Sequence, residues 1–446
     1  MNQSKQGSVF RTGKELFLFS VPLILSGILQ QLYNWADAFI VGHFVGEEAL
    51  AAVGATTTIT NLFILIITGF TLGLSIYAAY KYGENEQEEV RRTLSSFLLI
   101  LGVLFLVLSI VGIVLADFIL TAMNTSEDMF VPASDYLRVI LLGIPVLAVY
   151  NIYSSLLRAL NNSKAPFYAV LLSSVLNVVL DVLFVYVFPF GVTGAAAATV
   201  LSQIAMTVFI VLYSIKKYPI LRFTLKAKII YWETVRNGAR LGLPPAIQSS
   251  INALGNIALQ SFMNGFGTHT VAAVTTAYRI DSIILLPITN LSSGISTKVA
   301  NSMGRNNQKE ANNYLYTGFF MMLFFSILLT VLMPLCGGHL VSLFGVGTEA
   351  TEIGRYFFAS ISKFYLFFGM LSALRGYIEG IGKVFVSSTI GILALAFRIA
   401  LSYLLAPSLG NMSIAYSEGI QFIFMFVLYT VYFIFIWKKR DAIRSM

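Results

Sequence analysis

The sequence predicts an all-α polytopic membrane protein with twelve transmembrane helices, arranged in two six-helix lobes that are related by a parallel internal repeat. Three observations lead to this fold class. First, 57% of the 446 residues are hydrophobic and 11% are charged, whereas soluble domains carry about 25% charged residues. Second, apolar segments long enough to cross a bilayer follow one another along the chain. Third, the second half of the sequence repeats the first.

Twelve segments have the length and hydropathy of membrane spans. They are 15–41, 50–80, 93–116, 132–157, 166–188, 194–215, 240–263, 270–300, 313–335, 353–374, 384–405 and 413–437. Alternate connecting loops differ in charge, and one set contains no Lys or Arg: 42–49, 117–131, 189–193, 264–269, 336–352 and 406–412. Because basic loops stay on the cytoplasmic side, we expect a multi-pass plasma-membrane protein with both termini in the cytoplasm.

The repeat appears when the first half is shifted along the second. A shift of 221 residues places Gly46 on Gly267 and Gly73 on Gly294, and the shift becomes 217 farther along each half. Because each half has six spans, both halves enter the membrane in the same direction. Parallel repeats of this kind are a known transporter architecture. The alternative is a duplicated bundle without a transport pathway.

A basic segment between the halves sets the expected domain boundaries. We expect an N-lobe at 1–215, a cytoplasmic linker at 216–240 and a C-lobe at 241–446. The net charge of +8 follows from the basic loops and linker, so it does not require a nucleic-acid partner. We expect the lipid bilayer and small organic molecules as partners, and a monomer that is sufficient for function.

Several function classes are excluded by residues that the sequence lacks. The one cysteine, Cys336, excludes a disulfide framework, and the three histidines are scattered near loops. No P-loop is present, so transport would not be driven by ATP hydrolysis in this chain. No nucleophile–base arrangement is recognisable. We therefore expect no enzyme activity, no catalytic residue and no cofactor.

One carboxylate, Asp37, lies within the first span. A charge at the centre of a span costs roughly 2.5–3.5 kcal/mol on insertion scales, which marks it as a functional candidate. At helical spacing, Ser26, Gln30, Tyr33 and Asp37 share one narrow stripe. This stripe is therefore the first candidate site.

A second carboxylate, Asp181, lies in span 5, four residues after Asn177 and on the same helix face. With Asp37 and Thr199 they supply oxygens that suit a shared proton or Na⁺, for which Asp37, Asn177 and Asp181 would be the metal ligands. Because burial disfavours a charged carboxylate, such a group is able to load and release protons. The alternative is that the aspartates only hydrogen-bond neighbouring helices together.

The acidic site is absent from the second half. By the repeat offsets, Asp37 corresponds to Ala258 and Asp181 to Arg398. The charges within the C-lobe spans have mixed signs and are Arg279, Asp281, Lys363, Arg398 and Glu418. We expect internal pairing, for example of Arg398 with Glu418. The alternative is that these residues bind an anionic part of a substrate or gate the two lobes.

Pro22 and Pro244 occupy matching places in spans 1 and 7. A proline inside a span frees a carbonyl and permits a bend. We expect both to act as gating kinks, since a helix that bends near its carboxylate is able to link protonation to movement. Static kinks are the alternative.

Taken together, these motifs resemble the multidrug and toxic compound extrusion (MATE) family along essentially the whole chain. The resemblance rests on Pro22 followed by Asp37, on Asn177 and Asp181, and on the segments GHFVGEEALAAVG (42–54), GFTLGLS (69–75), LLRALNNSKAP (156–166), GVTGAAAAT (191–199) and LRGYIEGIGK (374–383). It implies a secondary antiporter that exports bulky, mostly cationic organic compounds in exchange for H⁺ or Na⁺.

The resemblance also implies roles for individual residues. The coupling cation would bind at Asp37, Asn177 and Asp181, with Thr199 and Tyr33 nearby. Apart from the resemblance, we expect substrate to contact five residues in the spans: Gln30, Asn34, Asn151, Asn252 and Arg279. Members with a second acidic site in the C-lobe carry it on spans 7 and 10, where this chain has Asn252 and a position near Phe364, so the closer resemblance is to members with an N-lobe site alone. A flippase or exporter of an anionic or lipid-linked metabolite is the alternative function.

Overall fold

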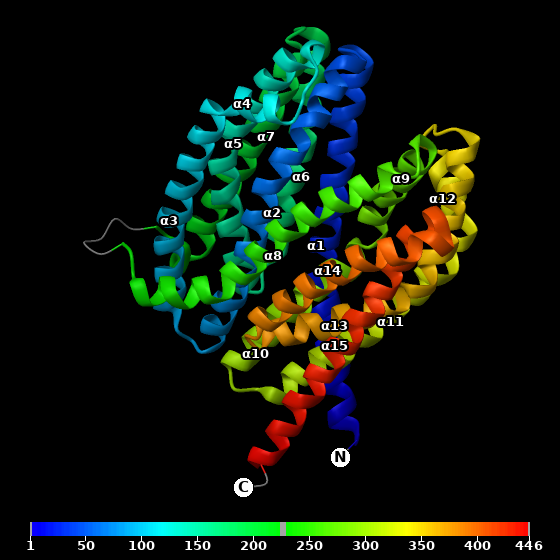
Figure 1. Cartoon of the computed structure of the whole chain (residues 1–446). Helices are drawn as coiled ribbons and strands as arrows, with labels where there is room; N and C mark the ends of the chain where they lie inside the picture. Colours follow the sequence, from blue (N-terminus) through cyan, green and yellow to red (C-terminus); the bar gives the residue numbers. More distant parts are fainter. Residues whose placement is uncertain (1, 224–228, 445–446) are drawn as a thin grey trace. The chain divides into compact units, whose positions relative to one another are not determined.

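The computed structural model describes residues 2–223 and 229–444, with side chains at 9–223 and 229–438, and these residues form helices and no β-strand (Figure 1). The α-helices are α1 (Asn2–Phe44), α2 (Glu47–Gly83), α3 (Gln87–Val114), α4 (Ala116–Ala122), α5 (Glu127–Ala159), α6 (Lys164–Asp181), α7 (Gly191–Lys217), α8 (Trp232–Asn264), α9 (Thr268–Ile284), α10 (Leu286–Gly304), α11 (Gln308–Ser342), α12 (Thr348–Ile361), α13 (Tyr365–Gly380), α14 (Val384–Leu409) and α15 (Ser413–Arg444). Four short helices, η1 (Val182–Val187), η2 (Pro219–Leu221), η3 (Ser362–Phe364) and η4 (Gly410–Met412), complete the order.

Each of the twelve predicted spans coincides with one helix or with two or three consecutive helices, so the predicted fold class is confirmed. Span 8 is the pair α9 and α10, which bends by 44°. By length and composition, nine stretches among the described helices are able to cross a membrane, and ten if the bent pair forms one span. The count is below twelve because α14 and α15 merge into one apolar stretch, 384–438, and because α8 contains many Gln, Ser and Asn residues.

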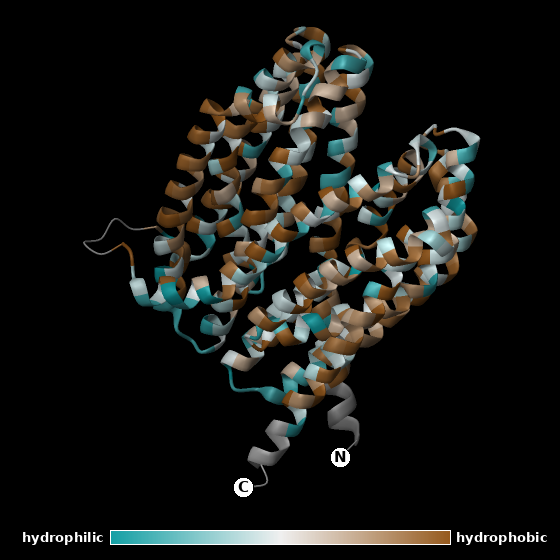
Figure 2. Cartoon of the chain, viewed as in Figure 1, coloured by the Kyte–Doolittle hydropathy of each residue, from teal (hydrophilic) through white to brown (hydrophobic). Residues whose placement is uncertain are grey.

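Lipid-facing surfaces are visible on the outer helices. On α3, five large apolar side chains are about half exposed: Val103, Leu104, Leu106, Val107 and Ile110. Figure 2 shows this helix as a mostly hydrophobic ribbon, while hydrophilic residues gather near the helix ends. In water such a patch would be unfavourable, whereas lipid tails solvate it.

By their contacts the residues form two compact units, which we call the N-unit (21–246) and the C-unit (1–20 with 247–446). The expected lobes, 1–215 and 241–446, follow chain order. The contact-defined units differ from them because α1 begins in the C-unit and α8 begins in the N-unit. Residues 224–228 of the expected linker lie outside the described residues.

Both units use the same packing pattern. In the N-unit α5 packs on α2, α3 and α7, and in the C-unit α13 packs on α10, α11 and α15. The turns repeat as well, since Gly46 and Gly267 have φ of 121° and 87°, and Asn85 and Asn306 have φ of 63° and 55°. Glycine tolerates this positive φ at no steric cost, and asparagine at little. The structure thus repeats the backbone conformation where the sequence repeats.

The first turns of α1 lie in the C-unit and those of α8 lie in the N-unit, and we call these two segments the exchanged helix ends. Each packs against a repeated glycine, Gly294 or Gly73. In the N-unit, a Cβ at Gly73 would overlap the carbonyl oxygen of Leu241 on α8. In the C-unit, a Cβ at Gly294 would overlap the hydroxyl of Ser20 on α1. Leu241 and Ser20 are 221 residues apart, as the two glycines are. In each half, the first turns of the other half's first helix therefore pack at the equivalent glycine.

Side-chain hydrogen bonds also hold the first turns of α1 and α8, one bond in each unit. In the C-unit, the Tyr314 hydroxyl of α11 donates a 2.7 Å hydrogen bond to Glu15 of α1. In the N-unit, the Thr234 hydroxyl of α8 donates a 2.6 Å hydrogen bond to Glu89 of α3. The exchange of helix ends is therefore specified by side chains in both units.

We predict that Gly73→Ala destabilises the protein by about 1–3 kcal/mol, because the added methyl group meets rigid backbone. Gly294→Ala should cost less, since a serine side chain is able to rotate away. The control is Gly102→Ala on α3, where a Cβ meets no atom within 4 Å. Thermal unfolding of the purified variants measures the order. Equal melting temperatures for all three would contradict the packing described here.

Candidate cation-binding site

Asp37 on α1 and Asp181 on α6 meet inside the N-unit. Asp37 is 9% exposed and Asp181 is fully buried. Their carboxyl groups lie within hydrogen-bonding reach of each other once one of them carries a proton. Oδ1 of Asp37 and both carboxylate oxygens of Asp181 have no hydrogen-bond partner among the described residues. The structure therefore brings together the two carboxylates that the sequence singled out, and leaves their oxygens available.

Asn177 and Thr199 complete the polar group. The Nδ2 of Asn177 on α6 donates a 3.4 Å hydrogen bond to Oγ1 of Thr199 on α7. This bond directs the amide oxygen away from Thr199, and that oxygen is also buried without a partner in the described structure. A buried acceptor without a partner costs about 1–3 kcal/mol. Several such acceptors therefore lie close together in the N-unit without a completed hydrogen-bond network among the described residues.

The walls of the site are apolar. The same helices also build one buried apolar cluster, from α1, α2, α5, η1 and α7: Ile40, Val41, Ala49, Val53, Tyr136, Ile140, Val185, Val192, Ala195 and Ala196. Two tyrosines interact electrostatically with the carboxylates, Tyr33 with Asp37 and Tyr136 with both. Tyr33 was expected from the sequence. Tyr136 was not expected, because it lies in a polar turn beside Ser134, Asp135 and Arg138 and gave no signal of its own.

Helix α6 changes its winding directly after Asp181. The segment Val182–Val187 is a π-helical turn, which ends with a 2.8 Å hydrogen bond from the Phe188 amide to the Leu183 carbonyl. Such turns are rare and occur frequently at functional sites. Asp181 is therefore the last residue of the α-helical segment and lies next to the wider π-helical turn. Nothing in the apolar sequence VLFVYV predicted it.

The predicted kinks lie where helices pass from one unit to the other. Pro22 lies inside α1 and Pro244, followed by Pro245, inside α8, close to the unit boundaries at 20/21 and 246/247. The Ser26 hydroxyl donates a 2.7 Å hydrogen bond to the Pro22 carbonyl, so it stabilises the turn that follows the proline. Their role in gating stays a prediction.

The predicted substrate residues are less closely assembled. Gln30 and Asn34 are exposed on α1, and the Asn151 amide donates a 2.8 Å hydrogen bond to the Leu147 carbonyl of its own helix. No hydrogen bond joins these three to the carboxylates in the portion of the chain that is described. In the C-unit, Arg279 is exposed and Asn252 is partly buried. Their role in substrate binding stays a prediction.

The C-unit has no equivalent of the paired aspartates, as the repeat indicated. Arg398 and Glu418 form a 2.8 Å ion pair, which confirms the predicted pairing. Asp281 instead accepts a 2.6 Å hydrogen bond from the Tyr365 hydroxyl. Lys363 is exposed. Within the described residues, no group of three or more His, Cys, Asp or Glu side chains is placed to hold a metal ion.

The fold and the site define a class of protein: a helical membrane protein with two repeated halves and a buried acidic site in one of them. The MatE family model matches the chain twice, at residues 22–183 and 244–404. The chain therefore belongs to the MatE family of membrane transporters, and this membership also confirms that it is not an enzyme. Both matches begin at the prolines, Pro22 and Pro244, that mark the unit boundaries.

Individual relatives agree with this assignment. The chain is 28% identical over 424 residues to the probable multidrug resistance protein YpnP of Bacillus subtilis, covering 94% of this chain and 93% of the relative. It is 25% identical over 348 residues to a FAD transporter of Shewanella oneidensis, covering 76% of each. Among solved structures, the outward-facing conformation of a multidrug resistance MATE family transporter matches with a TM-score of 0.89 and 22% identity, covering 94% and 95% of the chains.

We predict that Asp181→Asn does not lower the melting temperature of the purified protein at alkaline pH, since it replaces a charged group whose oxygens are unpaired. The matched control is Asp117→Asn, which removes a carboxylate that accepts a 2.7 Å bond from Arg138 and should lower stability by about 0.2–1 kcal/mol. A loss of several degrees in Asp181→Asn, larger than in the control, would instead show that Asp181 holds helices together.

Proposed function

We propose that this protein is a secondary active multidrug efflux antiporter that exports bulky, mostly cationic organic compounds in exchange for H⁺ or Na⁺. The observation that carries the proposal is the cluster of buried, unpartnered oxygens on Asp37, Asn177 and Asp181. These atoms suit a proton shared between two carboxylates, and equally a Na⁺ ion with carboxylate and amide ligands. The names of the relatives support the multidrug cargo.

The proposed cycle uses the coupling cation to change the charge of the N-unit. With the site empty, two buried carboxylates attract a cationic substrate. Uptake of H⁺ or Na⁺ at Asp37 and Asp181 removes that attraction, and substrate leaves outward. For the cation to drive the cycle, it must bind one conformation better than the other. The bend at Pro22 is the proposed element that differs between the two conformations.

The proposed location is the plasma membrane, with both termini in the cytoplasm. Support comes from the charge of the loops, because the set at 42–49, 117–131, 189–193, 264–269, 336–352 and 406–412 has no basic residue. A monomer contains both units and is sufficient for this mechanism.

An exporter of anionic metabolites is the second candidate. The relative named a FAD transporter favours it, as do the exposed Arg279 and Lys363 of the C-unit. Binding of cationic dyes compared with binding of anionic lipids or nucleotides by the purified protein separates the two functions.

We predict that Asp37→Asn abolishes dye efflux while the protein still inserts in the membrane, because the amide neither takes up a proton nor carries a charge. Asp128→Asn, at an exposed carboxylate in the first turn of α5, is the control and should export dye like the wild type. Efflux from cells with matched expression is the measurement. Normal efflux by Asp37→Asn would refute the mechanism.

The coupling ion is identified by flux in proteoliposomes. We expect dye uptake to follow either an imposed pH gradient or an imposed Na⁺ gradient, and to be lost in Asp37→Asn under the gradient that works. Absence of dye flux under both gradients, in vesicles that hold their gradients, would refute antiport.

A further inference from the structure

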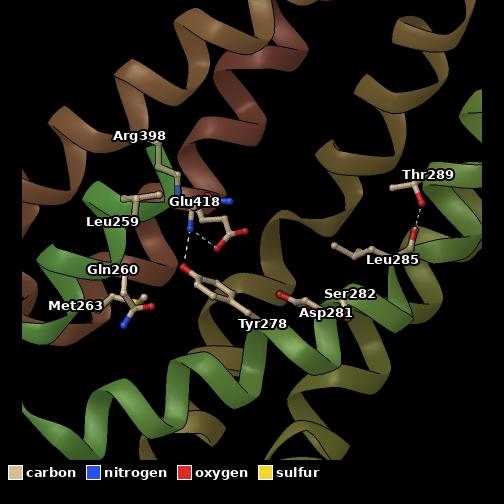
Figure 3. A pocket seen from close by; sticks show the side chains of 11 residues that line it. Leu259, Gln260, Met263, Tyr278, Asp281, Ser282, Leu285, Thr289, Arg398 and Glu418 are labelled. Atoms are coloured by element: carbon tan, nitrogen blue, oxygen red, sulfur yellow. Dashed lines mark hydrogen bonds and ion pairs between the residues drawn. The ribbon is translucent and has the colours of Figure 1, made fainter. Parts of the chain in front are cut away.

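Two arginines of the C-unit are balanced by carboxylates. Nη2 of Arg398 donates to Glu418 at 2.8 Å, and Figure 3 shows this contact beside the Tyr278 ring. Nε of Arg375 in α13 donates to Glu379 at 2.7 Å, four residues later on the same helix. The Glu379 side chain is 5% exposed, so its charge is neutralised inside the protein. Both arginines therefore have an opposite charge within their own unit.

The N-unit has an arginine, Arg158, at the position that corresponds to Glu379. Helices α5 and α13 end in the same turn, in which the amide three residues later donates a 2.9 Å hydrogen bond to the carbonyl of Arg158 or Glu379. The two donors are Asn161 and Gly382, which have φ of 62° and 81°. The repeated turn thus carries a positive charge in one unit and a negative charge in the other.

Arg158 has no partner of opposite charge. The residue four positions before it, at the place of Arg375, is Ser154. Arg158 is partly buried, and it forms no hydrogen bond or ion pair with another described residue. Between 139 and 232 the sequence has one acidic residue, Asp181, at the far end of α6. A partly buried guanidinium with five N–H donors is unfavourable without an acceptor.

The end of α5 does not need this arginine as a cap. A cation near a helix C-terminus is favourable, and its N–H groups are able to bind the last carbonyls. Here, however, the carbonyls of Leu156, Leu157 and Arg158 accept hydrogen bonds of 3.0, 2.8 and 2.9 Å from backbone amides of the following turn, 160–162. The guanidinium is therefore available to a group outside the chain.

The face of α5 that carries Arg158 lies against the start of α6. Tyr150, Ser154 and Arg158 follow one another at four-residue spacing and share this face. The Tyr150 hydroxyl donates a 3.5 Å hydrogen bond to the Pro166 carbonyl in the first turn of α6. Tyr150 and Arg158 also interact electrostatically. Arg158 therefore lies beside the connection between α5 and α6.

Two hydroxyl groups at the end of α7 add hydrogen-bond donors to this place. Asn162, in the same connection, donates through Nδ2 to the hydroxyls of Tyr213 and Tyr218 at 3.1 and 2.9 Å. Because each hydroxyl accepts this bond, its own proton remains for another acceptor. The Lys217 ammonium lies 5.5 Å from the centroid of the Tyr213 ring. This end of the N-unit thus offers donors and positive charge to an anion.

We propose that this end of the N-unit binds a phosphate group through Arg158, with the hydroxyls of Tyr213 and Tyr218 as further donors. A guanidinium suits phosphate because it presents two parallel N–H groups. The phosphate belongs either to the headgroup of an anionic lipid or to a free phosphate ion. Tyr168 on α6 and Leu212 on α7 are 52% and 51% exposed near the same helix ends, where acyl chains are able to pack. The site does not rest on the proposed antiport.

Isothermal titration calorimetry of the purified full-length protein in detergent tests this site with three probes. They are dioctanoyl phosphatidylglycerol, dioctanoylglycerol, which has the same chains without the phosphate, and inorganic phosphate. We expect Arg158→Gln to weaken binding of a phosphate probe by about tenfold or more, which corresponds to about 1.4 kcal/mol. Lys309→Gln, at an exposed basic residue of the C-unit, is the control and should bind like the wild type. A loss confined to phosphatidylglycerol identifies a lipid headgroup, and a loss that includes inorganic phosphate identifies a free ion.

Two further variants keep the test independent of Arg158→Gln. Arg158→Lys retains the charge and should recover part of the affinity, and Tyr218→Phe removes one donor and should weaken binding by about threefold. The proposal is overturned if Arg158→Gln and Tyr218→Phe, as monodisperse proteins, bind both phosphate probes like the wild type. It is also overturned if neither phosphate probe binds the wild type, or if dioctanoylglycerol binds as tightly as phosphatidylglycerol. Loss of ion-coupled flux with phosphate binding intact would refute the antiport mechanism and leave this site standing.

Discussion

The constraint on which the N-unit depends is the burial of two carboxylates that form no ion pair with a basic side chain among the described residues. Asp37 and Asp181 are buried on helices that otherwise contribute valine, isoleucine and alanine to a packed cluster, and an ion pair with a basic residue would have given each carboxylate an opposite charge. A buried ion pair, however, would fix the charge of the site permanently. Carboxylates whose oxygens have no partner among the described residues leave that charge open to change, and the proposed antiport uses this property.

Much of the fold was readable from the sequence because membrane spans are defined by length and hydropathy, and a repeat by identity at a fixed offset. The pair Arg398–Glu418 was also predictable, since two opposite charges in apolar spans of one lobe have few other partners. The association of Asp37 with Asp181 was expected for a different reason, because carboxylates in apolar spans with a nearby amide and hydroxyl suit one shared proton or cation. These features depend on residue type alone, and little on how helices pack.

Other features depend on packing and were out of reach. The π turn at 182–187 arises in a run of apolar residues that any helix accommodates. The hydrogen bonds from Asn162 to Tyr213 and Tyr218 required knowledge of how the turn after α5 meets the end of α7. The domain boundaries were expected at the basic linker, because sequence patterns show where the chain is polar. They do not show that the first turns of α1 and α8 pack within the other half's unit.

That exchange of helix ends at Gly73 and Gly294 has a consequence for the origin of the fold. Each half packs the first turns of the other half's first helix against one glycine, Leu241 at Gly73 and Ser20 at Gly294. A single half with this geometry would bury both surfaces only by pairing with a second copy of itself. In that sense the two halves of this one polypeptide complete each other as the subunits of a domain-swapped dimer do, although their polar residues differ, with Asp181 in one half where the other has Arg398.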